Sequence, residues 1–165
     1  MRMLNNIQLS PHFSLLELTE SATARQRDIA NIPPPEAVEN LKRLCKGTLE
    51  PLRKALGLPV IITSGYRCKE LNNIVNRSSK TSQHMLGQAA DFYVSCAGRE
   101  VLIKAFRLII TSPEIDYDQL ILYPNFIHVS YVSKERNRHN ILKARSNGKL
   151  GYGKLSYANA ILLNY

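Results

Sequence analysis

The chain has 165 residues, of which 44% are hydrophobic and 21% charged, a balance typical of one soluble globular domain spanning residues 1–165. No apolar run approaches the ~20 residues of a membrane-spanning helix, and the first twenty residues lack the apolar core of a secretory signal peptide. The net charge of +9 favours an anionic partner such as a bacterial cell wall, a membrane surface or nucleic acid.

The first part of the chain is predicted to be mainly helical. A capping-box pattern at Ser14–Glu17 predicts a short helix. Apolar residues at near-helical spacing predict a longer helix within residues 31–59, with Pro35 near its start and a kink or break at Pro51. The β-branched run Val60–Thr63 then predicts a strand.

Helices and strands alternate in the second part of the chain. The predicted elements are a short helix at 69–75, a polar loop at 76–88, a strand at 89–94, a helix at 98–112, and strands at 117–123 and 125–131. The last two form a hairpin around Pro124 and Asn125, and no pattern is clear in the final thirty residues. This order predicts an α+β domain with a small mixed or antiparallel sheet flanked by helices.

Two of these strands carry side chains that suit a metal ion. Along a strand, alternate residues share a face, so His128 points away from the apolar set, and Asp91 shares its face with Ala89 and Tyr93. If the strands are neighbours, Asp91 and His128 converge, and His84 approaches from the preceding loop. Two imidazoles and one carboxylate with an open fourth position suit catalytic zinc, although the His84–Asp91 stretch alone also fits an ordinary turn before a core strand.

The wider pattern is more specific. The spacing S-x-H-x-x-G-x-A-x-D is met in full by residues 82–91, between "SGYRC" upstream and "IHVSY" downstream. These three blocks resemble the zinc D-alanyl-D-alanine carboxypeptidase family, whose relatives include phage L-alanyl-D-glutamate endopeptidases and the hedgehog signalling domain. The similarity covers about residues 13–140. It implies a hedgehog-like fold, one Zn²⁺ ion and the ligands His84, Asp91 and His128.

The resemblance also implies that Arg67 faces the substrate. A guanidinium there can stabilise an oxyanion or clamp a carboxylate, whereas the plain alternative is a surface arginine on a turn. Ser82 is predicted to support the site by hydrogen bonding a ligand or neighbouring backbone, or simply to cap its loop.

One position departs from the family pattern. An acidic general base is usual three residues before the last histidine ligand, and Asn125 stands there. Asp118 is the predicted substitute. A three-residue hairpin loop would place Asp118 opposite Ser130 on the metal side, whereas a two-residue loop would place Gln119 there instead, so the register stays open.

The expected function is zinc-dependent hydrolysis of a peptide bond in bacterial cell-wall stem peptides, as a carboxypeptidase or an endopeptidase. The alternatives are a zinc-binding member with impaired catalysis that binds a partner, and a basic nucleic-acid-binding domain, for which no recognised motif is present. We expect a monomer with cell-wall peptides as partners, without nucleic acid or a membrane span. As in phage lysis, it would wait in the cytoplasm until release to the wall.

Overall fold

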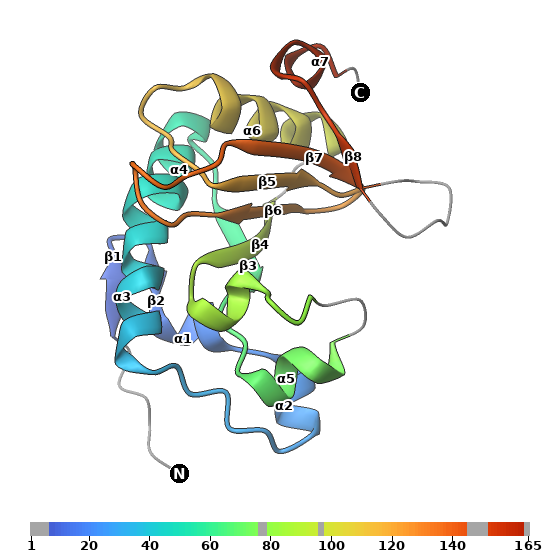
Figure 1. Cartoon of the computed structure of the whole chain (residues 1–165). Coiled ribbons are helices and arrows are strands. Elements are labelled where there is room, and N and C mark those ends of the chain that lie inside the picture. Colours follow the sequence, from blue (N-terminus) through green and yellow to red (C-terminus); the bar gives the residue numbers. More distant parts are fainter. Residues whose placement is uncertain (1–6, 76–78, 96–97, 145–151, 164–165) are drawn as a thin grey trace.

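The computed structural model describes residues 7–75, 79–95, 98–144 and 152–163. A six-stranded mixed sheet in the order β3-β4-β6-β5-β7-β8 forms its centre (Figure 1). The strands are β3 (Val60–Ser64), β4 (Ala89–Val94), β5 (Gln119–Leu122), β6 (Ile127–Ser130), β7 (Asn140–Ala144) and β8 (Tyr152–Lys154). The predicted α+β fold with a mixed sheet and flanking helices is confirmed.

A small antiparallel pair precedes the first helices. It consists of β1 (Gln8–Ser10) and β2 (Phe13–Ser14), and the helices α1 (Leu15–Thr19) and α2 (Ala22–Gln26) follow. Ser14 caps α1, because its hydroxyl accepts a hydrogen bond from the backbone of Glu17 at 3.2 Å. The short helix predicted from the capping-box pattern is therefore present.

The long predicted helix contains a distortion at Pro51. It comprises α3 (Pro35–Leu44), a π-helical turn η1 (Cys45–Leu49) and α4 (Glu50–Leu56), and it ends at the left-handed Gly57. Proline has no N–H to donate to the preceding turn. The carbonyl of Gly47, four residues before Pro51, accepts the backbone N–H of Asp116 instead at 3.1 Å. The helix continues through Pro51 rather than breaking.

Four further helices complete the described chain. They are α5 (Lys69–Ile74), the 3₁₀ helix η2 (Gln83–Leu86), α6 (Arg99–Thr111) and α7 (Tyr157–Ile161). The η2 turn lies inside the segment predicted as a polar loop, of which residues 76–78 are outside the described part. None of the described helices combines the length and apolar composition needed to cross a membrane.

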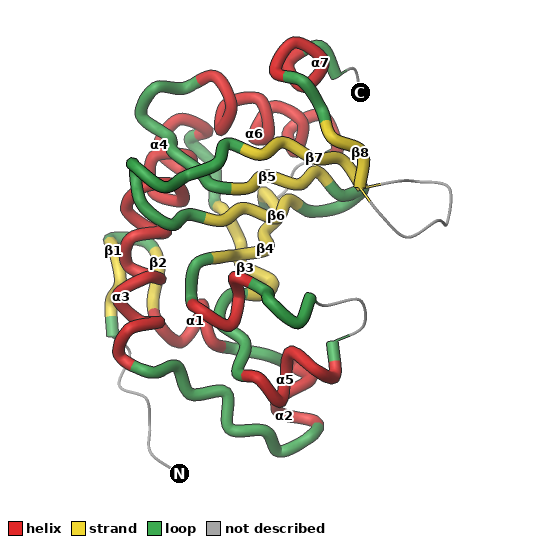
Figure 2. Tube along the Cα trace, viewed as in Figure 1, coloured by secondary structure: helices red, strands yellow, loops and turns green. Residues whose placement is uncertain are grey.

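One face of the sheet packs against the hydrophobic core, and the opposite face carries polar side chains. Phe92 of β4 and Ile127 of β6 belong to the hydrophobic core, together with residues of α3, α4 and α6. Figures 1 and 2 show these helices on one side of the sheet. Because side chains alternate along a strand, the residues between the core positions point to the opposite side, and Asp91 and His128 are among them.

The final part of the chain extends the sheet. β7 pairs in parallel with β5, and β8 pairs antiparallel with β7, so that β5 lies between β6 and β7. α7 then packs against α6. These elements had no sequence prediction.

Two glycines with the same backbone conformation give a test of packing at the η2 turn. Gly57 and Gly87 have φ of 65° and 68°, but a Cβ on Gly57 would meet no atom within 4 Å, whereas one on Gly87 would lie 2.3 Å from the Ala37 carbonyl oxygen. Gly57→Ala should lower the free energy of unfolding by about 1–2 kcal/mol, the cost of a left-handed residue with a side chain.

Gly87→Ala carries the same conformational cost as Gly57→Ala and adds a clash with the backbone of Ala37. We therefore expect it to lower the free energy of unfolding by roughly twice as much or more. Denaturant unfolding of both variants measures the difference. Equal losses would show that the η2 turn moves freely away from α3 and that the close approach is unimportant.

Candidate metal centre

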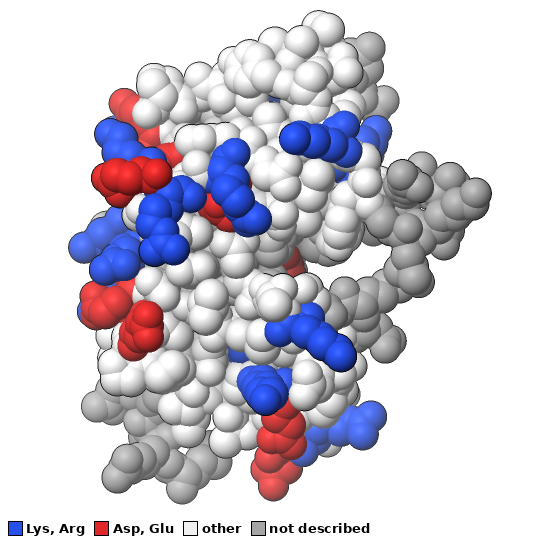
Figure 3. Space-filling view, in the orientation of Figure 1, with Lys and Arg blue, Asp and Glu red and all other residues white. Residues whose placement is uncertain are grey.

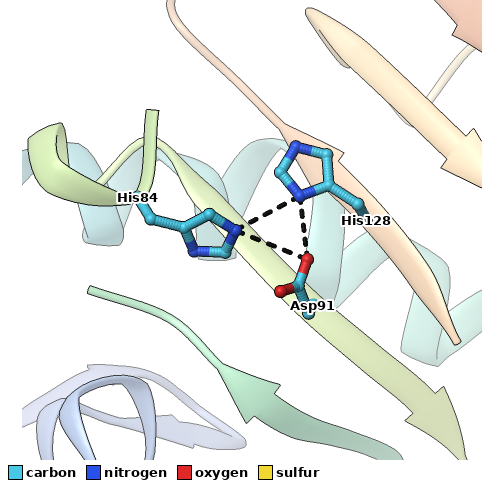
Figure 4. A group of neighbouring side chains, drawn as sticks. All are labelled: His84, Asp91 and His128. Carbon is cyan, nitrogen blue, oxygen red and sulfur yellow. Dashed lines mark hydrogen bonds and ion pairs between the residues drawn. The ribbon is translucent and has the colours of Figure 1, made fainter. Parts of the chain in front are cut away.

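Three side chains that can bind a metal converge on the face of the sheet opposite the core. Asp91 on β4 and His128 on β6 are direct partners in the antiparallel register, and His84 approaches from η2. Figure 4 shows the three side chains pointing toward one another. The convergence predicted from strand alternation is therefore found, and it depends on β4 and β6 being neighbours.

The spacing of the three donor atoms fits one tetrahedral ion. His128 Nδ1 lies 2.8 Å from Asp91 Oδ1 and 3.2 Å from His84 Nε2, and the remaining His84–Asp91 separation is 3.4 Å. Zinc bonds of ~2.0–2.1 Å in tetrahedral geometry place ligand atoms roughly 3.3 Å apart. The residues present fit zinc in chemistry and in separation, and three protein ligands leave the fourth tetrahedral position to a ligand from outside.

Hydrogen bonding fixes which nitrogen His84 offers. Its Nδ1 lies 2.6 Å from the carbonyl oxygen of Gly65, which can only accept, so the proton resides on Nδ1 and the lone pair of Nε2 faces Asp91. A backbone carbonyl behind a ligand imidazole is a common way to set its tautomer and orientation. Burial, which leaves the side chain 2% exposed, lowers the pKa of His84 and favours the neutral form that binds a metal.

The charge state of Asp91 also suits a ligand. Burial alone would raise its pKa, but the imidazoles of His84 and His128 interact with the carboxylate and hold its pKa well below the usual range. Asp91 is thus an anion at neutral pH. Together the three groups supply one negative charge and two lone pairs in a small, largely buried volume.

The glycines of the two sequence blocks permit close backbone approaches. A Cβ on Gly65 would lie 2.2 Å from the Leu18 carbonyl oxygen, and that carbonyl accepts the N–H of Tyr66 at 2.7 Å. Gly87 ends η2 in a left-handed conformation against Ala37. Only glycine fits these contacts, which hold both the turn after β3 and the turn that carries His84.

Ser82 caps the turn that carries His84. Its hydroxyl accepts a hydrogen bond from the backbone N–H of His84 at 3.4 Å. The predicted contact with neighbouring backbone is therefore present, and in this case it is also the helix cap, so the two interpretations of Ser82 coincide.

Arg67 is attached to the same turn through its backbone. Its N–H donates to the carbonyl of His84 at 3.2 Å. Burial lowers the pKa of Arg67, while the nearby Asp91 and Tyr123 act in the opposite direction. Its Nε is buried without a hydrogen-bond partner among the described residues. A half-buried guanidinium with an unused donor beside Asp91 differs from a solvated surface arginine.

Asn31 is a supporting residue that sequence reasoning missed. Its amide donates to the carbonyl oxygens of Thr19 and Tyr66, and its carbonyl accepts the N–H of Cys68. Asn31 therefore holds the chain on both sides of Arg67. No local pattern in the sequence indicates this role, because the contacts span 35 and 37 residues.

The hairpin register decides between the two placements considered for Asp118. Gln119 lies opposite Ser130, and Leu122 opposite Ile127, which leaves Pro124 and Asn125 as a two-residue loop. The register with Asp118 opposite Ser130 is wrong. The shift by one residue follows from the loop length, since Tyr123 N–H donates to the Phe126 carbonyl at 3.0 Å and closes the turn.

Asp118 instead lies at the centre of a buried polar network. It is 1% exposed, and Arg138 donates to it from both its backbone and its guanidinium, the backbone bond being 2.9 Å long. Gln83, the residue before His84, donates to the other oxygen at 2.9 Å. Burial would raise the pKa of Asp118, but these hydrogen bonds outweigh it and lower the pKa. The contacts are those of a carboxylate that positions η2, and its general-base role stays a prediction.

Tyr123 is a second residue near the centre that sequence reasoning did not select. Burial raises the pKa of its phenol, a hydrogen bond with Tyr152 raises it further, and the charges of Asp91 and Arg67 also act on it. The phenol therefore stays protonated and can donate a hydrogen bond. Asn125, where the family usually has an acid, is exposed in the hairpin loop.

A family model described as Peptidase M15 matches residues 11–130, well over half of the chain. The matched range includes His84, Asp91, His128 and Arg67, and it ends at the last residue of β6. A search of curated proteins found no match.

Removal of either histidine tests the metal assignment. We expect about one zinc per chain in wild-type protein purified without chelator, because a site of this kind holds one ion with three protein ligands. His84→Ala and His128→Ala should each lose most of it, and elemental analysis measures the content. The control His12→Ala removes a histidine that pairs with Glu50 at the surface. Full zinc content in both site variants would refute the ligand set.

The Asp118–Arg138 pair predicts a pH-dependent contribution to stability. Since the folded pKa of Asp118 lies below the ~3.9 of an unfolded chain, the stabilisation is present above that pH and disappears as the pH falls through the folded pKa. Asp118→Asn should therefore lower the free energy of unfolding by about 1–3 kcal/mol at pH 7, with a smaller difference below about pH 4.

Denaturant unfolding across this pH range measures the effect, with exposed Glu114→Gln as the control. Arg138→Ala should reproduce much of the loss in stability, because it removes the partner of the same carboxylate. A stability equal to wild type in Asp118→Asn at pH 7 would contradict the structural role. A loss of hydrolysis confined to Asp118→Asn, with Arg138→Ala fully active, would instead favour Asp118 as the base.

Proposed function

Because the chain belongs to the peptidase M15 family, whose members are zinc-dependent, we propose that it hydrolyses a peptide bond in the stem peptides of bacterial peptidoglycan. The observation that carries the proposal is the His84–Asp91–His128 cluster, with donor separations that suit one zinc ion. Family membership supports a metallopeptidase, and the wall substrate is our inference from the resemblance of the three sequence blocks.

Each residue of the centre has a role in this chemistry. When bound, zinc activates a water molecule for attack and polarises the scissile carbonyl. Asp91 supplies negative charge to the site, and neutral His84 is held in orientation by the Gly65 carbonyl. His128, on the rigid strand beside Asp91, completes the set. Ligands from two paired strands and one capped turn give a preorganised site.

Arg67 is the residue that we assign to the developing negative charge. As a peptide carbonyl is attacked, charge accumulates on its oxygen, and a guanidinium fixed beside the site stabilises that charge more in the transition state than in the substrate. The backbone bond to His84 and the clamp by Asn31 fix the chain at Arg67. In a carboxypeptidase reaction the same side chain can bind the free carboxylate of the substrate.

The positive charge of the protein supports an anionic polymer as its substrate. The chain carries +9, and Figure 3 shows basic side chains scattered over the visible face, mixed with acidic ones on the side where α3 and α4 lie. Such a distribution favours long-range attraction to a negatively charged wall over recognition of a defined groove. Release from the cytoplasm during lysis is the route to the wall that we propose.

A second candidate follows from Asn125. An amide cannot accept a proton from water as a carboxylate does, so a member with Asn125 in the usual acidic position can bind zinc and wall peptides with impaired catalysis. Hydrolysis of purified peptidoglycan separates the two candidates. An inactive wild type that becomes active as Asn125→Asp would favour the impaired member.

Arg67→Ala tests the proposed catalytic arrangement. Zinc content and unfolding should stay near wild type, while hydrolysis of purified wall should fall by roughly a hundredfold or more, the usual effect of removing an oxyanion-stabilising group. Arg67→Lys should restore activity only in part, since lysine lacks the planar fork. Arg25→Ala, at an exposed arginine paired with Glu20, is the matched control. Wild-type turnover in Arg67→Ala would make Arg67 an ordinary turn residue.

A further inference from the structure

A row of aromatic side chains lies beside the metal centre, on the face of the sheet opposite the core. Asp91, His128 and Ile121 lie opposite one another on β4, β6 and β5. Two positions away from these residues come Tyr93 on β4, Phe126 just before β6 and Tyr123 just after β5, and continuing the strand alternation places them on the same face. We name this line of side chains, continued below, the aromatic row.

The last strands extend the aromatic row. Leu122 lies opposite Lys143 in the parallel β5–β7 pair, so Tyr123 is level with Ala144, and Ala144 lies opposite Tyr152 on β8. The small side chain at Ala144 leaves space for the ring of Tyr152 to reach Tyr123. Their hydroxyls are 2.7 Å apart, and their rings meet edge to face. Tyr152 lies beyond the part of the chain that matches the family.

Two rings of the aromatic row stack on each other, and the two rings at its ends are exposed. Tyr123 and Phe126 stack with centroids 4.1 Å apart and an angle of 11° between their planes. Tyr93 and Tyr152, at its two ends, are 42% and 46% exposed. Exposed aromatic surface is costly to leave in water, and a set of neighbouring aromatic rings is a typical binding surface.

The row adjoins the reacting centre. The charges of both Asp91 and Arg67 act on Tyr123. Two residues along a strand correspond to about 7 Å, so a molecule that occupies the row lies next to a peptide bond held at the metal centre. The row is therefore placed to bind a part of the substrate that is covalently close to the scissile bond.

The chemistry of the row favours sugar over peptide. On β4, β6, β5 and β7 both edges of the strand are paired within the sheet, so an added peptide finds no main-chain partner there. The row consists of Tyr93, Phe126, Tyr123, Ala144 and Tyr152, and it carries no charge. Flat rings that stack on C–H-rich faces, with phenol hydroxyls beside them for hydrogen bonding, suit the uncharged rings of a glycan.

We propose that the aromatic row binds the glycan part of peptidoglycan while the metal centre holds the attached stem peptide. This inference rests on the proposed function and deepens it, since it makes the substrate the sugar-bearing wall rather than a free peptide. It also gives the segment beyond the family match a role, because Tyr152 completes the row and hydrogen bonds to Tyr123.

Direct binding tests the row without any need for catalysis. The zinc-loaded protein should bind a tetramer of N-acetylglucosamine, measured by calorimetry and by NMR shifts of residues in the row. Tyr152→Ala and Tyr123→Ala should weaken this binding by about five- to tenfold, in line with the energy of one aromatic contact. The control Tyr157→Ala removes an exposed tyrosine on α7 and should bind as wild type. Absence of binding by wild type, or equal binding by all variants, would overturn the proposal.

Steady-state kinetics then show whether the aromatic row acts on the sugar or on the peptide part of the substrate. For wild type, kcat/KM should be higher on a disaccharide-linked stem peptide than on the same peptide without sugar, and Tyr152→Ala should lower this ratio by about five- to tenfold with zinc content unchanged. Equal losses on both substrates would make the row a peptide subsite and refute sugar binding. If neither substrate is cleaved while the tetramer still binds at the row, the proposed hydrolysis fails and the glycan site stands.

Discussion

The hydrogen bond from His84 to the carbonyl of Gly65 is the interaction on which the arrangement of the centre depends. It joins the turn after β3 to the η2 turn, two segments that are 19 residues apart in sequence. It places the proton on Nδ1, turns Nε2 toward Asp91, and is reinforced by the backbone bond from Arg67 to His84. A candidate metal ligand, His84, and Arg67 are thus held by one local set of bonds.

The two glycines of the sequence blocks follow from the same constraint. The Gly65 carbonyl can reach His84 only because the chain there runs against Leu18, and Gly87 lets the η2 turn close against Ala37. Side chains at either position would push the backbone segments apart. Glycine, histidine and arginine in these blocks therefore form one spatial unit, although each pattern looks like an isolated turn in the sequence.

Strand alternation predicts that Asp91 and His128 share a side of the sheet and meet if their strands are neighbours. The structure supplies that condition, because β4 pairs with β6. The hairpin register was beyond prediction, since a change of one residue in the loop reverses every side chain on β5. Asn31 and Arg138 could not be predicted either. Their contacts depend on segments brought together by the complete fold, and no local pattern records such contacts.

The spacing between the aromatic row and the metal centre limits which bond the proposed reaction could cut. Both features are built on the same paired strands, so the distance between them is set by two residues of a stiff sheet and does not adjust to the substrate. An extended peptide advances ~3.5 Å per residue, so ~7 Å corresponds to about two residues. With sugar bound in the row, only a peptide bond about two residues from the glycan would reach the metal centre. A bond at the far end of the stem peptide would lie too far away.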